Sequence, residues 1–255
     1  MSARSSLVFL LLGGCDLAFG VGGDPDPCEL ASFDKARSTD INMASTFSVD
    51  WDQRFAVVDL NTGLFAELDL PAGTSRLIDL GPSSPLSLAL SPEGSALLYT
   101  TGGEPPILEG ALRGEPGMWK LGARVPTATF VGTTSADVFG PRRALARIRP
   151  FDTELQELED DNGTWVPVGD PHPFEGQSAP NLTPNGLTAV FAVRTPTETS
   201  FTSEIYGMTR ASTAEWFGAP VKILANDKDS APQLLGHCER LYTIHDENMM
   251  RRYDR

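Results

Sequence analysis

The sequence is short of positive charge and of the motifs typical of catalysis. It contains 20 Lys and Arg against 34 Asp and Glu, which gives a net charge of -14 at pH 7. A field of this sign repels phosphate backbones, so no nucleic acid is expected among the partners. The patterns His-Glu-x-x-His, Cys-x-x-Cys and Gly-x-Ser-x-Gly are all missing. We therefore predict no metal site of standard spacing, no cofactor and no hydrolase nucleophile of the elbow type.

Histidine is rare and the acidic residues form no recognisable calcium loop. His237 and His245 flank a short apolar segment and are expected to be turn residues, and His172 lies far from both in the sequence. The acidic run 157–163 lacks the alternate-position spacing and the closing glutamate of a calcium loop. Its Asn-Gly dipeptide at 162–163 instead predicts a solvated hairpin turn.

Long hydrophobic runs are also missing at the N-terminus. Arg4 precedes the apolar run Leu7–Leu12, which is the order of a secretory signal and is too short to span a bilayer. The residues Leu12-Gly13-Gly14-Cys15 resemble a bacterial lipobox. The resemblance implies a signal peptide at 1–14, a lipidated Cys15 and a protein anchored to a membrane by its lipid chains. A plain secretory signal with an incidental cysteine is the alternative.

The rest of the chain is rich in turn formers. With 24 Gly and 20 Pro spread between short apolar runs, the sequence favours an all-β protein. Residues 15–30 are expected to form the lipidated cysteine and a flexible tether, and residues 31–255 a single domain. Within the domain an apolar, turn, apolar unit recurs every 40 to 52 residues. This period predicts a β-propeller of four-stranded blades. Five blades are expected, with six as the alternative. The competing fold is a β-sandwich in which the units are unrelated hairpins. The five units begin at Val49, Leu90, Phe130, Leu182 and Leu234.

The segment 179–224 is the clearest copy of the unit. Its Pro-Asn-Gly turn at 184–186 precedes a continuous apolar strand at 188–193, and further strands are predicted at 204–210 and 220–224. The pattern resembles the TolB-like, WD-type β-propeller repeat, with its Pro-Gly turn, aromatic second strand, Ile-Tyr third strand and Arg-ending loop. The matching residues are Leu182, Pro184, Gly186, Phe191, Ile205, Tyr206 and Arg210, and, for the first half of an earlier copy, Leu90, Ser91, Pro92, Gly94 and Tyr99.

The two ends of the chain are predicted to meet. The last unit holds only three evident strands, and residues 33–38 precede the first unit as residues 217–222 precede the last. The N-terminal segment is therefore expected to supply the outer strand of the final blade and close the ring. With Cys15 lipidated, Cys28 and Cys238 remain as an even pair in an exported chain. We expect them to form a disulfide, with two unpaired thiols as the alternative.

Two functions compete at this point. The first is a non-enzymatic binding or scaffold module of the bacterial cell envelope, periplasmic or surface-exposed, which holds an envelope protein or glycan on its loops or channel mouth. The inner or outer membrane stays open. The second is an envelope hydrolase or lyase whose channel-facing carboxylates are Asp50, Asp52, Glu93 and Glu239. The four tryptophans are expected to pack between blades, with a sugar-stacking platform as the alternative; they are Trp51, Trp119, Trp165 and Trp216.

Overall fold

The chain folds almost entirely into β-strands. The computed structural model describes residues 28–33, 35–42, 46–60, 64–80, 85–90, 94–101, 107–121, 136–139, 143–147, 154–161, 164–174, 180–197, 201–226, 229–235, 238–245 and 249–255. Within these residues there are 20 strands, arranged as five four-stranded sheets. The predicted all-β class and the predicted four-stranded sheets are confirmed.

Each sheet contains strands that follow one another along the chain, except the last. The first sheet has β2 (Phe47–Val49), β3 (Phe55–Asp59), β4 (Phe65–Asp69) and β5 (Thr74–Ile78). The second has β6 (Pro85–Leu90), β7 (Ala96–Thr101), β8 (Ile107–Arg113) and β9 (Trp119–Leu121). The third has β10 (Ala136–Phe139), β11 (Arg143–Arg147), β12 (Glu154–Asp161) and β13 (Thr164–Pro173).

The fourth sheet has β14 (Asn181–Leu182), β15 (Thr188–Pro196), β16 (Phe201–Thr209) and β17 (Val221–Asn226). The last combines β18 (Asp229–Leu235), β19 (Arg240–His245) and β20 (Met249–Asp254) with the first strand of the chain, β1 (Lys35–Asn42).

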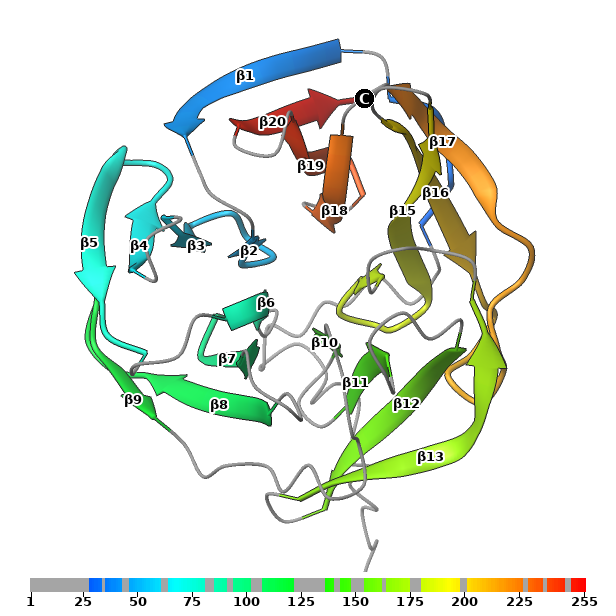
Figure 1. The fold of residues 1–255 in the computed structure, drawn as a ribbon, viewed down its shortest axis with the longest axis horizontal. Helices are drawn as coiled ribbons and strands as arrows, with labels where there is room; N and C mark the ends of the chain where they lie inside the picture. The colour runs from blue at the N-terminus through cyan, green and yellow to red at the C-terminus, as the bar shows by residue number, and fades with distance from the viewer. Residues whose placement is uncertain are drawn as a thin grey trace, which may run out of the picture.

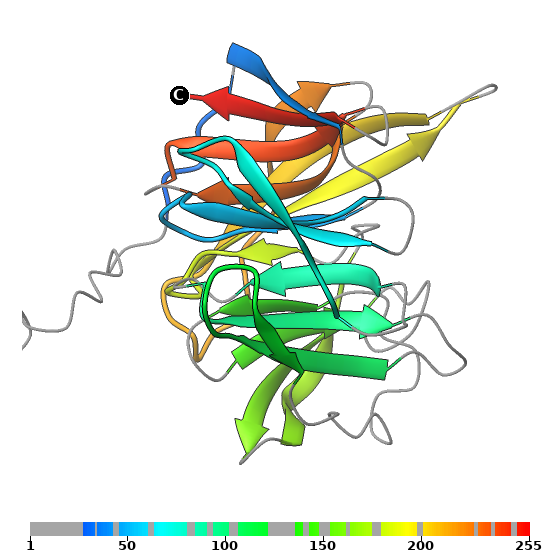
Figure 2. The ribbon, with the colours of Figure 1, turned by 90° about the vertical axis from the view of Figure 1, so that its left-hand side faces the viewer.

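The sheets surround a common centre in a propeller-like arrangement (Figure 1). The inner strands contact one another in the order β2, β6, β10, β14 and β18, and β18 returns to β2. Figure 2 shows that the strands run broadly along the axis of this ring, so the turns gather on its two faces. We call the face that carries the β2–β3 and β4–β5 turns (residues 50–54 and 70–73) the turn face.

Side chains tie neighbouring inner strands together. Ser48 Oγ accepts a hydrogen bond of 2.9 Å from the Leu90 N–H and joins β2 to β6. Asn181 Oδ1 accepts one of 3.3 Å from the Leu234 N–H and joins β14 to β18. The Gln233 amide spans β18 and β2 by bonding to one backbone acceptor and one backbone donor of β2. These side chains provide hydrogen-bond partners for backbone N–H and C=O groups of the inner strands that are not paired within their own sheets.

The turn before the second strand of a sheet needs one residue in the left-handed conformation. Gly94 and Gly186 fill this place with φ of 71° and 68°, as the Pro-x-Gly turns predict. In the first and last sheets the same place is taken by Gln53, with φ of 57°, and Cys238, with φ of 69°. Because neither residue is glycine, residue type alone did not indicate the left-handed conformation in these two turns.

The N-terminal strand supplies the outer edge of the last sheet, as predicted. β1 pairs antiparallel with β20, with Lys35 opposite Asp254 (Figure 1). The strand begins two residues after the expected start, because Phe33 instead donates its N–H to the Ile223 carbonyl over 3.1 Å. The ring of Phe33 lies 4.8 Å below the guanidinium of Arg255.

The same stacking occurs one sheet earlier. The Arg210 guanidinium lies 4.5 Å above the ring of Phe217. The proposed correspondence between residues 33–38 and 217–222 is therefore confirmed in three dimensions by a repeated arginine-phenylalanine contact.

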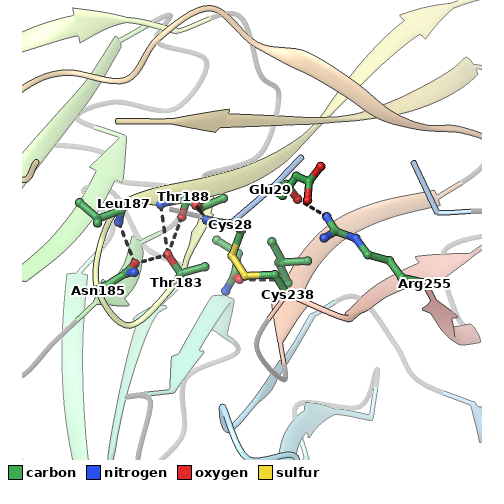
Figure 3. The surroundings of a disulfide bond; sticks show 10 residues. Cys28, Glu29, Thr183, Asn185, Leu187, Thr188, Cys238 and Arg255 are labelled. Carbon is green, nitrogen blue, oxygen red and sulfur yellow. Dashed lines mark hydrogen bonds between the residues drawn. A yellow bond between two sulfur atoms is a disulfide. The ribbon is translucent and has the colours of Figure 1, made fainter. Parts of the chain in front are cut away.

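Residues 28–33 form a clasp between the fourth and last sheets. Cys28 and Cys238 form a disulfide, with Cα atoms 5.8 Å apart (Figure 3). The Cys28 N–H donates to Thr188 Oγ1 over 2.8 Å. Arg255 Nη2 donates to the Glu29 carbonyl, which holds the chain end against the clasp.

The predicted tether boundary at residue 30 is wrong. Cys28 is buried, and Leu30 packs so closely over Gly207 that a Cβ there would meet its Cδ2 at 2.5 Å. A larger residue at Gly207 would force the Leu30 side chain to move, so this glycine in the middle of β16 makes room for the clasp. Residues 28–33 therefore belong to the folded part, and the disulfide fixes them to the last sheet.

The apolar core is divided among the interfaces between neighbouring sheets. Val57 and Tyr99 belong to the cluster between the first and second sheets, and Val190 and Leu241 to the cluster between the fourth and last. Strands buried on both faces, such as β3, therefore read as continuous apolar runs.

Candidate functional site

A pocket of about 190 Å³ opens on the turn face between the first and second sheets. It lies where the β2–β3, β4–β5 and β8–β9 turns approach one another. Its walls carry three arginines and two carboxylates above an aromatic ring. The lining residues are Arg54, Phe55, Glu67, Asp69, Thr74, Arg76, Arg113 and Pro116.

The back of the pocket is a fixed ion pair between the two sheets. Arg113 Nη2 and Nε donate to the two carboxylate oxygens of Glu67 over 2.6 and 3.2 Å, and the Trp119 indole N–H donates to the same carboxylate over 3.1 Å. The guanidinium lies 3.9 Å from the centroid of the Phe55 ring. A two-point contact of this kind fixes the plane of the guanidinium as well as its position.

The charge state of Glu67 follows from these partners. Burial opposes ionisation, but the hydrogen bond and charge of Arg113, with the Gly117 N–H and the Trp119 indole, outweigh it and lower the pKa of Glu67 below its ordinary value. The carboxylate is therefore ionised at neutral pH and neutralises Arg113.

A second arginine at the mouth is also paired. Arg54 Nε donates to Asp50 Oδ2 over 2.9 Å, and the backbone N–H groups of Arg54 and Phe55 donate to Asp50 Oδ1. The hydrogen bond that Arg54 donates to Asp50 raises the pKa of Arg54 further, against a smaller effect of burial. Asp50 thus acts as the cap of its own turn.

Arg76 and Asp69 have fewer partners in the part of the chain that the structure describes. Arg76 Nη1 donates to the Pro116 carbonyl over 3.1 Å, and Asp69 Oδ1 accepts from the Ala72 N–H over 2.9 Å. In the β4–β5 pairing Glu67 lies opposite Arg76 and Asp69 opposite Thr74, so all four side chains share one face of the hairpin.

The arginine at the back of the pocket occupies a position that recurs. Arg113 is the last residue of the third strand of its sheet, and Arg210 and Arg255 directly follow the third strand of theirs. Each donates its N–H to the carbonyl of the residue before the second strand of its sheet. Arg113 pairs with Glu67 of the preceding sheet, and Arg210 Nη1 donates to Glu157 of the sheet before its own. The loop-ending arginine of the repeat is therefore an inter-sheet ion-pair residue.

This arrangement corrects the prediction for the acidic run. The strands expected on either side of the Asn-Gly turn, 155–158 and 164–168, lie within β12 and β13, which pair antiparallel, and the turn itself lies outside the described residues. What the solvated-turn interpretation did not anticipate is that Glu157 is buried. Sequence reasoning also missed Glu67. A usable signal exists, since Glu67 and Glu157 precede their arginines by 46 and 53 residues, about one repeat.

The structure describes three of the four carboxylates proposed for catalysis, and they lie in different surroundings. Asp50 is fully buried and bonded within its turn, the Asp52 side chain is 63% exposed, and Glu239 is exposed on the β18–β19 turn. Glu93 lies outside the described residues, as does Cys15. The described three therefore form no shared acid-base site.

The histidines and tryptophans make structural contacts. His172 stacks on Trp216 with ring centroids 3.9 Å apart, and His245 Nδ1 lies 2.8 Å from Asp229 Oδ1. Trp51 packs against the clusters on both sides of the last sheet. His237 and the side chain of Trp165 lie outside the described part of the structure.

Among the described residues, no three His, Cys, Asp or Glu side chains converge as a metal site would require. Nor does this part of the chain include a helix long and apolar enough to cross a membrane.

The fold and pocket define the class: an all-β protein of four-stranded sheets in a propeller-like ring, with a charged pocket on its turn face. No family model and no curated protein matches the sequence. Similar solved structures include TolB from Acinetobacter baumannii, with 14% identity over 87% of this chain and 55% of that one, at a TM-score of 0.48. A putative TolB from Agrobacterium tumefaciens has 14% identity over 79% of this chain and 69% of that one, at 0.49.

A third similar structure is hydrazine synthase from Kuenenia stuttgartiensis. It has 11% identity over 82% of this chain and 57% of that chain, at a TM-score of 0.49. The chain thus spans little more than half the length of two of the three. At this level the likenesses assign neither a ligand nor an activity.

Proposed function

We propose that the protein is a non-enzymatic binding module of the bacterial cell envelope, and that the pocket on the turn face is its binding site. In this proposal the sheets are the blades of a closed, five-bladed propeller of the WD type, related to TolB. The lipobox resemblance supports lipidation at Cys15 and a folded domain held in the periplasm or at the cell surface. The partner is an envelope protein or glycan.

The observation that carries the proposal is the construction of the pocket. Its polar side chains come from strand ends and turns of two different sheets, and the Glu67–Arg113 pair and the Phe55 ring join the two sheets at the pocket. A pocket held in this way needs little reordering when a partner binds, which lowers the entropic cost of association. Recognition on loops over a rigid ring is the general design of such scaffolds.

Capture from envelope extract tests the function. The lipidated full chain is cross-linked in intact cells and recovered with its partners, together with a chain carrying Arg76→Met. The matched control is Lys222→Met, since Lys222 is an exposed cation on β17, in a different sheet. We expect the wild type and the control to enrich the same partner and Arg76→Met to lose it. If neither enriches any species above a mock sample, the protein is not a binding module of the envelope.

Anchoring is tested separately by mass. Intact mass of the detergent-extracted protein should show loss of residues 1–14 and addition of lipid at Cys15, and a Cys15→Ser chain should stay unlipidated. An unlipidated mature chain would support the plain secretory signal instead.

A further inference from the structure

The pocket has a charge arrangement that selects its ligand. Its lining includes three cations, Arg54, Arg76 and Arg113, and two anions, Glu67 and Asp69. Glu67 neutralises Arg113, and Asp50, behind the wall, neutralises Arg54. After these pairs cancel, one positive group and one negative group remain.

The remaining cation is Arg76. Its Nη1 is bonded to the Pro116 carbonyl, and no carboxylate within the described residues forms an ion pair with it. Arg113 bonds to Glu67 through Nε and Nη2, so among the described residues its Nη1 edge is left without a protein acceptor. Two guanidinium groups on opposite walls therefore have donors to offer to one small acceptor.

The remaining anion is Asp69. It lies on the same face of the β4–β5 hairpin as Arg76, two residues along from Glu67. Its Oδ1 is occupied by the Ala72 N–H, which leaves Oδ2 as an acceptor in the described part of the molecule. A ligand that bears an anionic oxygen pair next to an N–H donor matches both groups.

Resting on the proposed function, we infer that the pocket binds a peptide carboxylate, with its oxygens on Arg76 and Arg113 and a neighbouring N–H on Asp69. A carboxylate matches because it carries a single charge and has two oxygens, so it can accept one charge-assisted hydrogen bond from each of the two guanidinium groups. A phosphate dianion is disfavoured, because Glu67 and Asp69 would lie beside its second charge. The Phe55 ring and Pro116 supply apolar contact for the rest of the residue.

The carboxylate has two possible sources, a chain terminus and an acidic side chain, and peptide probes distinguish them. Three probes are titrated into the ¹⁵N-labelled full chain: acetyl-Gly-Gly-Gly with a free carboxyl end, the same peptide amidated, and acetyl-aspartyl-amide. Inorganic phosphate is the fourth. The readouts are the Arg Nε–H signal of Arg113 and the indole signal of Trp119, which both bond to Glu67.

We expect one of the two carboxylate probes to shift both signals saturably, with a Kd on the order of 1 mM for a few charge-assisted contacts in an open pocket. Arg76→Met should raise this Kd about tenfold, the loss expected from one such contact. Lys222→Met should leave it unchanged. Since Arg76 is exposed, its variant should keep the wild-type thermal midpoint.

Each of three results would overturn the inference. They are no saturable shift with either carboxylate, a Kd unaffected by Arg76→Met, and tighter binding of phosphate or of the amidated peptide. The envelope capture tests the proposed function separately. If Arg76→Met still captures the partner, the pocket chemistry is refuted, and the protein remains a binding module that uses another surface.

Discussion

Removing the guanidinium of Arg210 should strand a buried charge. The side chains of Arg210 and Glu157 are 1% and 9% exposed, and Arg210 Nη1 donates to Glu157 across the interface of the third and fourth sheets. Arg210 also donates to the carbonyls of Gly186, over 2.7 Å, and Glu215, over 3.1 Å. Arg210→Leu keeps an apolar side chain over Phe217 and removes the guanidinium that pairs with Glu157.

The expected loss is large against the total stability of a domain. Breaking a buried ion pair by removing one partner costs about 3–5 kcal/mol, where a whole domain is stabilised by about 5–15 kcal/mol. A control exists in the fourth sheet itself. The Lys222–Glu204 pair has a similar length, 2.6 Å, but its side chains are 45% and 36% exposed. Lys222→Leu should cost no more than about 1 kcal/mol.

Urea unfolding followed by circular dichroism measures both variants, with the midpoint and slope fitted separately. The double variant Glu157→Leu with Arg210→Leu should recover part of the loss, because it removes the stranded charge. If Arg210→Leu costs no more than the Lys222 control, the pair is not stabilising as described. If the double variant is no more stable than Arg210→Leu, the loss comes from packing and not from the stranded carboxylate.

Three further predictions concern the turns, the clasp and the last sheet. Gly94→Ala should lower the free energy of unfolding by about 2–4 kcal/mol, because its φ is 71° and a Cβ would meet the Phe55 ring at 2.5 Å. Gly73→Ala, with φ of 66° and open space around it, should lose only the backbone strain of about 1–2 kcal/mol. Urea unfolding measures both variants. Cys28→Ser should lower the thermal midpoint as much as reductant lowers that of the wild type, with a loss of up to about 5 kcal/mol in the loop-entropy account, and an unchanged midpoint would exclude the staple. Burial and the hydrogen bond to a buried aspartate raise the pKa of Tyr253 to about 12, above an unfolded value of about 10. The contribution of Tyr253 to the free energy of unfolding should therefore be fully present below pH 10 and be lost between about pH 10 and 12. Tyr253→Phe should flatten that fall, and an identical pH profile would contradict the assignment.

The sequence predicted the strands best where hydrophobic period and turn chemistry agreed. The segment 188–193 lies inside β15, 204–210 overlaps β16 and 220–224 overlaps β17, because an interior strand packed on both faces must be continuously apolar. The turn at Gly186 was equally legible, because its positive φ favours glycine. Where Gln53 holds the same conformation, tertiary contacts decide it, since its Oε1 accepts from Arg240 and Tyr242 of the last sheet.

The pocket was not predictable in the same way. Phe55 and Arg113 are 58 positions apart in the sequence, and Glu67 shows no local pattern that distinguishes a buried carboxylate from a solvated one. Amino-acid composition and hydrophobic periodicity indicate which face of a strand is buried. Which side chain a buried residue meets across an inter-sheet interface depends instead on how the sheets are placed relative to one another. Glu157 was expected in a strand, but for this reason its burial and its arginine partner were not predicted.

The pairing of β1 with β20 has a consequence for synthesis of the chain. Lys35 lies opposite Asp254, so β1 stays unpaired until the chain has been made as far as β20. At about 5–20 residues per second this interval is on the order of 10–40 s, during which β1 has an unpaired edge open to other chains. Newly made chains should therefore be most prone to strand exchange and aggregation before β20 has been made, and a chain that ends before β20 should leave β1 without a strand to pair with.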